Sequence, residues 1–206
     1  MIVYSTPTGW EMIYQRAHAL LAAQIAAHWR MDQRPARWVE TLAAITQHDD
    51  GGLEWEGSNL LTPAGAPKDF KLGTVSLTQP TEAIMHARYQ GQYIALLQSM
   101  HVCTLYKDFS DEPEFAQFIT EQETLQGKWR KALKMTKTEA DACYRLLYWS
   151  DAFSLILCQR QFPTDGRRIE IGHGMDKTVY YARALPDAGG SDPRSGGDET
   201  TLTVEP

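Results

Sequence analysis

Three titratable side chains, His18, His101 and Asp151, lie on otherwise apolar faces of helices that the sequence predicts. Their neighbours at helical spacing are Tyr14, Leu21, Ile25 and Trp29 for the first, Ile94, Leu97 and Leu105 for the second, and Tyr144, Leu147, Leu155 and Cys158 for the third. Each of the three side chains should therefore point into the interior. Because a buried polar or charged group has to be hydrogen-bonded, paired or metal-bound, the fold must bring partners to them.

A fourth polar feature is the pair His48-Asp49, which ends an apolar predicted helix and is followed by two glycines. An imidazole nitrogen beside a carboxylate oxygen suits zinc, iron or manganese, and the two adjacent residues can reach one ion from a helix end. The alternative is an ordinary helix C-terminus, in which the His compensates the helix dipole and the Gly caps the helix. Each inward His or Asp can likewise be a hydrogen-bonded core residue. The choice between this interpretation and a metal site depends on which other side chains lie beside each of them.

The order of His18, His48-Asp49, His101 and Asp151 along the chain resembles that of the HD-domain superfamily, over most of residues 10–161. This superfamily comprises all-helical metal-dependent phosphohydrolases and a smaller branch of di-iron oxygenases. The phrases around the motif are more similar to those of an uncharacterised bacterial family of unknown function than to those of well-studied members. They are Gln15-Arg16-Ala17-His18, His48-Asp49-Asp50-Gly51 and Ser99-Met100-His101.

The resemblance implies a site for one or two divalent transition metal ions, Fe, Mn or Zn. It implies that one ion is held by four residues, which are His18, His48, Asp49 and Asp151. His101, together with His86, would match the additional histidines of the two-metal members, with Asp49 bridging the ions.

We therefore expect an all-α fold, an HD-domain-like helical bundle over residues 1–185, followed by a disordered polar tail over residues 186–206. The predicted helices span residues 10–30, 36–48, 80–90, 92–109, 113–133 and 137–162. Gly91 is expected to break the chain between two of them. Residues 167–171 and 178–182 predict a β-hairpin, which an N-terminal strand at residues 1–5 would extend to three strands.

Residues 50–79 contain many Gly and Pro residues and show no helical period, so we interpret them as a lid or pocket wall beside the proposed ligands. Trp55 and Phe70 would be its apolar anchors. Glu54 and Glu56 are the carboxylates placed to act near the metal, as a proton shuttle or as hydrogen-bond partners of the ligands. Solvent-exposed charge around a buried Trp is an equally good interpretation of both.

The leading functional hypothesis is a metal-dependent hydrolase of the HD type that acts on a phosphoester of a small molecule or nucleotide. Its catalytic residues would be Asp49, Glu54, Glu56 and Lys68. Lys68, Arg16 and Arg145 are the nearest cations that could face a phosphate. The alternatives are an HD-type di-iron oxygenase, which needs His86 and His101 as ligands, and a non-catalytic helical domain stabilised by its metal.

Net charge and cysteine spacing limit the class of binding partner and the cellular compartment that we expect. The 206-residue chain has a net charge of −6 and no run of Lys or Arg, which argues against a nucleic-acid or membrane-surface partner and favours a small-molecule substrate. Cys103, Cys143 and Cys158 have neither metal-type nor secretory spacing, so we expect reduced thiols and a cytoplasmic protein. No apolar run approaches the ~20 residues that span a bilayer.

Overall fold

The computed structural model describes residues 1–50, 60–163, 166–185 and 202–206. Six α-helices make up most of these residues, and they are α1 Gln15–Ala27, α2 Trp38–Thr46, α3 Thr78–Gln90, α4 Gln92–Leu105, α5 Pro113–Leu133 and α6 Lys137–Cys158. The strands are β1 Ile2–Thr6, β2 Gly9–Ile13, β3 Arg168–His173, β4 Val179–Ala184 and β5 Leu202–Glu205. The described part of the chain is thus mostly helical, as expected, with two small antiparallel sheets.

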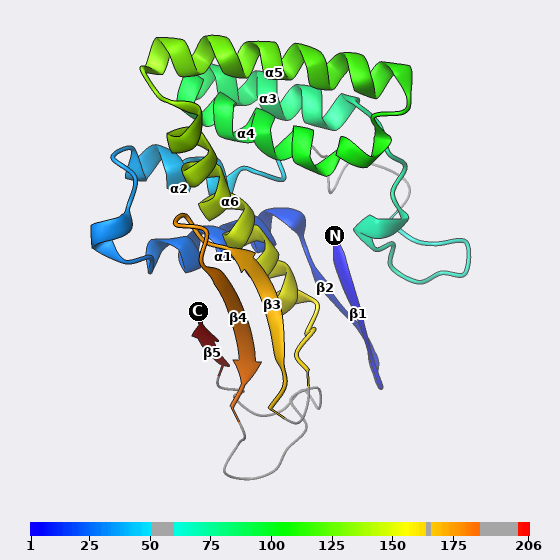
Figure 1. The fold of residues 1–206 in the computed structure, drawn as a ribbon. Coiled ribbons are helices and arrows are strands. Elements are labelled where there is room, and N and C mark those ends of the chain that lie inside the picture. The colour runs from blue at the N-terminus through cyan, green and yellow to red at the C-terminus, as the bar shows by residue number, and fades with distance from the viewer. Residues whose placement is uncertain (51–59, 164–165, 186–201) are drawn as a thin grey trace.

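Helix α4 forms the centre of the helical part, because it packs against α2, α3, α5 and α6 (Figure 1). A helix that is apolar on all sides is stable only when it is surrounded, and Ala95, Leu96 and Leu97 are fully buried in succession. Gly91 separates α3 from α4, as predicted, and its φ of 153° is a conformation that favours glycine. This break folds α4 back against α3.

Helix α6 connects the helical core to the C-terminal sheet. It begins with a capping box, in which Thr136 and Glu139 satisfy each other's backbone N–H groups. Farther along α6, Trp149 packs against Trp29, which follows the end of α1, and against Tyr180 of β4. The guanidinium of Arg145 donates hydrogen bonds to backbone carbonyls in the β3–β4 turn, with Nη2 2.7 Å from the oxygen of Met175. Arg145 is therefore a structural residue.

The N-terminal strand does not join the C-terminal hairpin, so that expectation is wrong. β1 instead pairs with β2, and Ile2 lies opposite Ile13. Residues 10–13, assigned to the first helix, form β2 because Trp10 and Met12 alternate with half-buried residues in a strand that starts at Gly9, whose φ is 152°. The first helix begins at Gln15, and the other helix ends either coincide with the predicted ones, as at both ends of α5, or differ by a few residues.

The predicted β-hairpin is present as β3 and β4, but its third strand comes from the opposite end of the chain. β5 pairs antiparallel with β4, with Ala182 opposite Val204. The prediction of a disordered tail is therefore wrong for Leu202–Glu205, where Leu202 and Val204 alternate with polar residues. The rest of that predicted tail, residues 186–201, lies outside the described residues.

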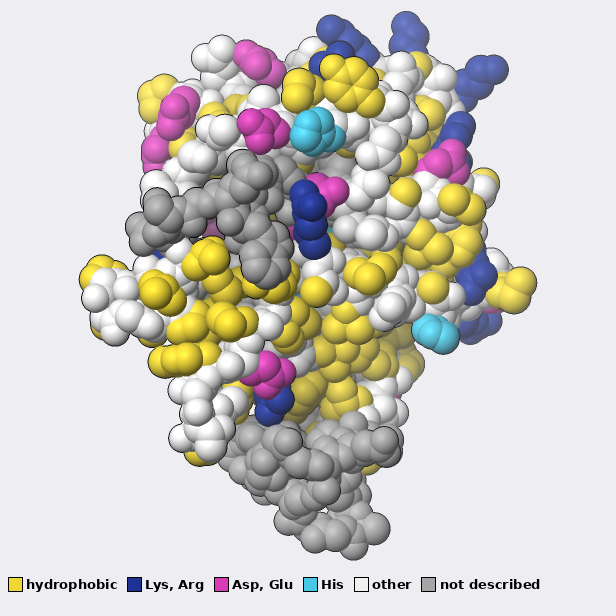
Figure 2. Space-filling model, turned by 180° about the vertical axis from the view of Figure 1, so that it is seen from behind, with side chains coloured by type: hydrophobic (Ala, Val, Ile, Leu, Met, Phe, Trp, Pro, Cys, Tyr) yellow, Lys and Arg dark blue, Asp and Glu magenta, His cyan; other side chains and the backbone are white. Residues whose placement is uncertain are grey.

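The surface seen in Figure 2 is not uniformly polar. Hydrophobic side chains gather in the middle and lower part of this face, while many of the Lys and Arg side chains stand towards its edges. Within the described part of the chain, no helix has the length and apolar character needed to cross a bilayer.

Candidate metal centre

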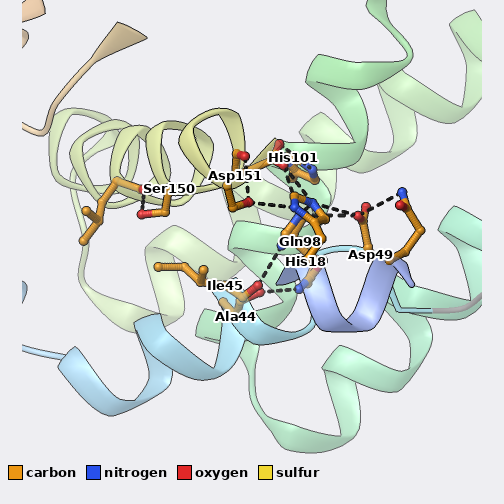
Figure 3. A network of polar contacts seen from close by, with 12 residues as sticks. His18, Ala44, Ile45, Asp49, Gln98, His101, Ser150 and Asp151 are labelled. Atoms are coloured by element: carbon orange, nitrogen blue, oxygen red, sulfur yellow. Dashed lines mark hydrogen bonds and ion pairs between the residues drawn. The ribbon is translucent and has the colours of Figure 1, made fainter. Parts of the chain in front are cut away.

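Imidazoles and carboxylates from four helical segments meet inside the protein, as Figure 3 shows for His18, Asp49, His101 and Asp151. Helix α1, which carries His18, and helix α4, which carries His101, each pack against both α2 and α6. His48 joins the group from the turn after α2. Adjacent residues on a helix do not face the same way, so the end of α2 at Thr46 is what allows both His48 and Asp49 to reach the cluster.

The tightest part of the cluster is a triangle of three atoms. His18 Nε2 lies 3.1 Å from His48 Nε2 and 3.1 Å from Asp151 Oδ1, and His48 Nε2 lies 3.2 Å from the same oxygen. Asp49 Oδ2 adds a fourth atom, 3.2 Å from His18 Nε2 and 3.5 Å from His48 Nε2. Neighbouring ligand atoms of an ion with bonds of 2.0–2.2 Å are about 2.9–3.6 Å apart, so these spacings match a coordination shell.

The hydrogen bonds on the far side of each ring fix which nitrogen faces the cluster. His48 Nδ1 lies 2.7 Å from the carbonyl oxygen of Ile45, which can only accept, so Nδ1 carries the proton. Ser154 Oγ donates to the carbonyl of Asp151 at 2.9 Å and therefore accepts from His18 Nδ1 at 2.7 Å. In the neutral form of both rings, the Nε2 lone pairs consequently point at each other and at two carboxylates.

This arrangement requires positive charge at its centre, because four electron-pair donors would otherwise repel one another. Burial opposes a charge on His18, but hydrogen bonds with Asp151 and Asp49 outweigh burial and raise the pKa of His18 to about 11. The pKa of His48 is also raised against burial, by the charges of Asp49 and Asp151. Burial disfavours ionisation of both carboxyls, yet the imidazoles lower the pKa of Asp49 and of Asp151.

The residues present fit a divalent transition metal. Two neutral imidazole nitrogens and two carboxylate oxygens form a donor set that zinc, iron and manganese all accept. The hydrogen bonds from Nδ1 of His18 and His48 are the outer contacts that hold imidazole ligands in one tautomer. His18, His48, Asp49 and Asp151 are therefore the residues that would hold the ion.

His101 stands slightly apart from these four residues. It is buried, and its Nε2 lies 3.9 Å from Asp151 Oδ2. His48, Asp49 and His101 form a second group of potential ligand atoms, which lie within 4.8 Å of one another. This group shares His48 and Asp49 with the four residues above. Burial lowers the pKa of His101 to about 4, so the ring is neutral at about pH 7.

The other predicted site residues lie in different places. His86 is exposed on α3 and is not brought to the cluster, because the inward face of that helix is formed by Ala83, Ile84 and Ala87. Glu54 and Glu56, like Trp55, lie outside the described residues. Phe70 is 36% exposed, so it is no buried anchor.

A cleft of about 490 Å³ opens over the cluster. His18, His48, Asp49, His101 and Asp151 all line it, and so does Lys68. Residues 60–75 supply much of the wall, as expected of a pocket wall in this segment. Arg16 does not line the cleft and instead pairs with Asp50 at 3.2 Å.

Sequence reasoning missed three polar residues that position the cluster. Gln15 Nε2 donates to Asp49 Oδ2 at 3.3 Å, and Gln98 Nε2 donates to the carbonyl of Ala44 at 2.8 Å, which holds α4 to the end of α2. Ser154, fully buried, orients His18. A Ser on the apolar face of α6 gives little signal, whereas Gln98 on the stripe of His101 could have been noticed.

Ser154 should be needed for metal affinity but not for the fold. We expect Ser154→Ala to weaken binding of Mn²⁺ or Zn²⁺ by about 10–100-fold at unchanged stoichiometry, because His18 loses the partner that fixes its tautomer. Ser150→Ala is a matched control, since Ser150 is equally buried one turn earlier and bonds only to the carbonyl of Leu146 among the described residues. Titration calorimetry measures both, and equal affinities in the two variants would contradict the role of Ser154.

Metal binding should release protons. The raised pKa values of His18 and His48 mean that the metal-free cluster holds protons at about pH 7, and an ion must displace them. Affinity should therefore rise with pH, and about one or two protons should be released per ion. Calorimetry in two buffers of different ionisation enthalpy counts the protons, and an affinity independent of pH would contradict this prediction.

Comparison with known protein families matches residues 1–206 to a family described as "Protein of unknown function (DUF3891)". Searches of curated proteins and of solved structures found no match. Because the match spans the whole sequence, the chain belongs to the DUF3891 family.

Proposed function

We propose that the protein is a metal-dependent phosphohydrolase of the HD type that cleaves a phosphoester of a small molecule. The observation that carries this proposal is the position of the two-His, two-Asp cluster in an open cleft that also contains a lysine. A cluster that served stability alone would have no need of a cleft of about 490 Å³ leading to it. The order of the residues in the HD-domain superfamily supports the same reaction class.

A bound divalent ion would supply Lewis-acid polarisation of a phosphoryl oxygen and would acidify a water molecule. The chain's own groups would do the remaining work. Asp151 is the more buried carboxylate, with 9% of its side chain exposed, and it fixes both imidazoles. Asp49 is 20% exposed and is held by the amide of Gln15, so it is the carboxylate of the cluster that would orient an attacking water through a hydrogen bond.

Lys68 has a separate role in this proposal. It is the one Lys or Arg among the described residues that line the cleft. An ammonium group there would neutralise part of the charge of a bound phosphate and would raise its local concentration. Arg16 and Arg145 are engaged elsewhere, the first with Asp50 and the second with the β3–β4 turn.

The proposal is tested by metal analysis and turnover of the same preparation. We expect one equivalent of metal and hydrolysis of phosphomonoesters that stops with a chelator and resumes with Mn²⁺. Asp151→Asn should reduce both metal affinity and turnover by at least about 100-fold, because the ion loses its most buried anionic ligand. Two equivalents of iron with substrate-dependent oxygen consumption would support the oxygenase instead. Metal binding without turnover of any ester would contradict the hydrolase and support a non-catalytic domain that its metal stabilises.

Lys68 gives a second test with a control three residues away. Lys68→Gln should lower kcat/KM for a phosphomonoester by about 10–100-fold, mainly through KM, because the phosphate loses its cationic partner. Lys71→Gln should leave the kinetics unchanged, since Lys71 Nζ already bonds to Gln159 Oε1 at 2.7 Å and does not line the cleft. Equal effects of the two substitutions would show that only the overall charge matters.

A further inference from the structure

The wall of the cleft carries exposed apolar side chains beside its polar groups. Leu60, Phe70, Val75 and Leu105 line the cleft and remain 36–49% exposed. Exposed apolar side chains around a polar centre are typical of a ligand-binding pocket, in which a few polar groups orient a mainly hydrophobic ligand. The walls therefore favour a substrate whose body is apolar.

The charges in the cleft limit how many phosphate groups the substrate can carry. Among the described lining residues, the carboxylates are Asp49, Asp50, Asp69 and Asp151, whereas Lys68 is the one Lys or Arg. Arg16 offsets Asp50, and backbone N–H groups of Val3 and Lys71 bond to Asp69. Because Asp49 and Asp151 already balance the charge of a divalent ion, Lys68 is the one Lys or Arg of the described lining left to face a phosphate, and each additional phosphate group would lie beside carboxylates without a cationic partner.

We propose that the substrate is a phosphomonoester of an apolar alcohol, with the phosphate at the His and Asp cluster beside Lys68 and the chain or ring on Leu60, Phe70, Val75 and Leu105. This inference rests on the proposed hydrolase function and narrows its substrate class. The cleft volume of about 490 Å³ lies in the usual range for small-molecule pockets and accommodates a phosphate with an attached chain of several carbons.

The test uses non-hydrolysable phosphonates with the full-length, Mn²⁺-loaded protein. Hexylphosphonate and 6-hydroxyhexylphosphonate carry the same charge and differ only in the polarity of the chain end. We expect hexylphosphonate to bind at least about tenfold more tightly in calorimetry, because its terminal carbons are transferred from water to the apolar side chains of the wall. A nucleoside triphosphate added with equimolar Mn²⁺ should displace it poorly.

Two leucines provide matched variants. Leu105→Gln should remove most of the preference for the hexyl chain, because Leu105 lines the cleft and is 49% exposed. Leu20→Gln should leave the preference intact, since Leu20 is 50% exposed on another helix and is not part of the lining. Both positions are half-exposed on helices, so neither substitution should prevent folding.

Turnover of hexyl phosphate and 6-hydroxyhexyl phosphate separates the two proposals. Equal binding of the two phosphonates, with turnover of both esters, would overturn the apolar substrate and keep the hydrolase. A clear binding preference without turnover of any ester would keep the apolar anionic ligand and overturn the hydrolase. Binding of neither phosphonate would overturn the inference outright.

Discussion

The structure depends on a buried cluster of electron-pair donors, nitrogen and oxygen atoms that repel one another unless a proton or a metal ion lies between them. Two imidazole nitrogens and the carboxylate oxygens of Asp49 and Asp151 approach one another to 3.1–3.5 Å in the pairs that involve an imidazole. In the absence of a proton or an ion at the centre, such a group would be strongly destabilising, because buried lone pairs and charges lose their hydration. Helices α1 and α6 and the turn after α2 all meet at this point.

Three residues of the cluster could be found from sequence because each violates a local rule. His18, His101 and Asp151 occupy positions where periodicity demands an apolar residue, and all three are buried in the structure. His86 has no such position, since it lies on the solvent side of α3, and only the resemblance to two-metal proteins suggested it. The pattern of burial was therefore a better guide to the cluster than the identity of the residue type.

The parts that sequence did not predict are short segments whose role depends on a partner that the local pattern does not identify. β2 was absorbed into a helix because five residues ending in Met12-Ile13 lead straight into the apolar period of α1. β5 was missed because its four residues follow a long polar stretch, and only the free edge of β4 gives them a partner. The hydroxyl of Ser154 was missed for a similar reason, since its role depends on His18, far away in the chain.

The separation of the cluster residues along the chain has a thermodynamic consequence. His18 lies near one end of the helical region and Asp151 near the other, so the complete cluster exists only after α1 and α6 have docked. An ion that binds the docked state and not the open chain shifts the folding equilibrium in proportion to the logarithm of its free concentration. The supply of metal would then govern how much of this protein is folded, and for how long it resists proteolysis, independently of any reaction in the cleft.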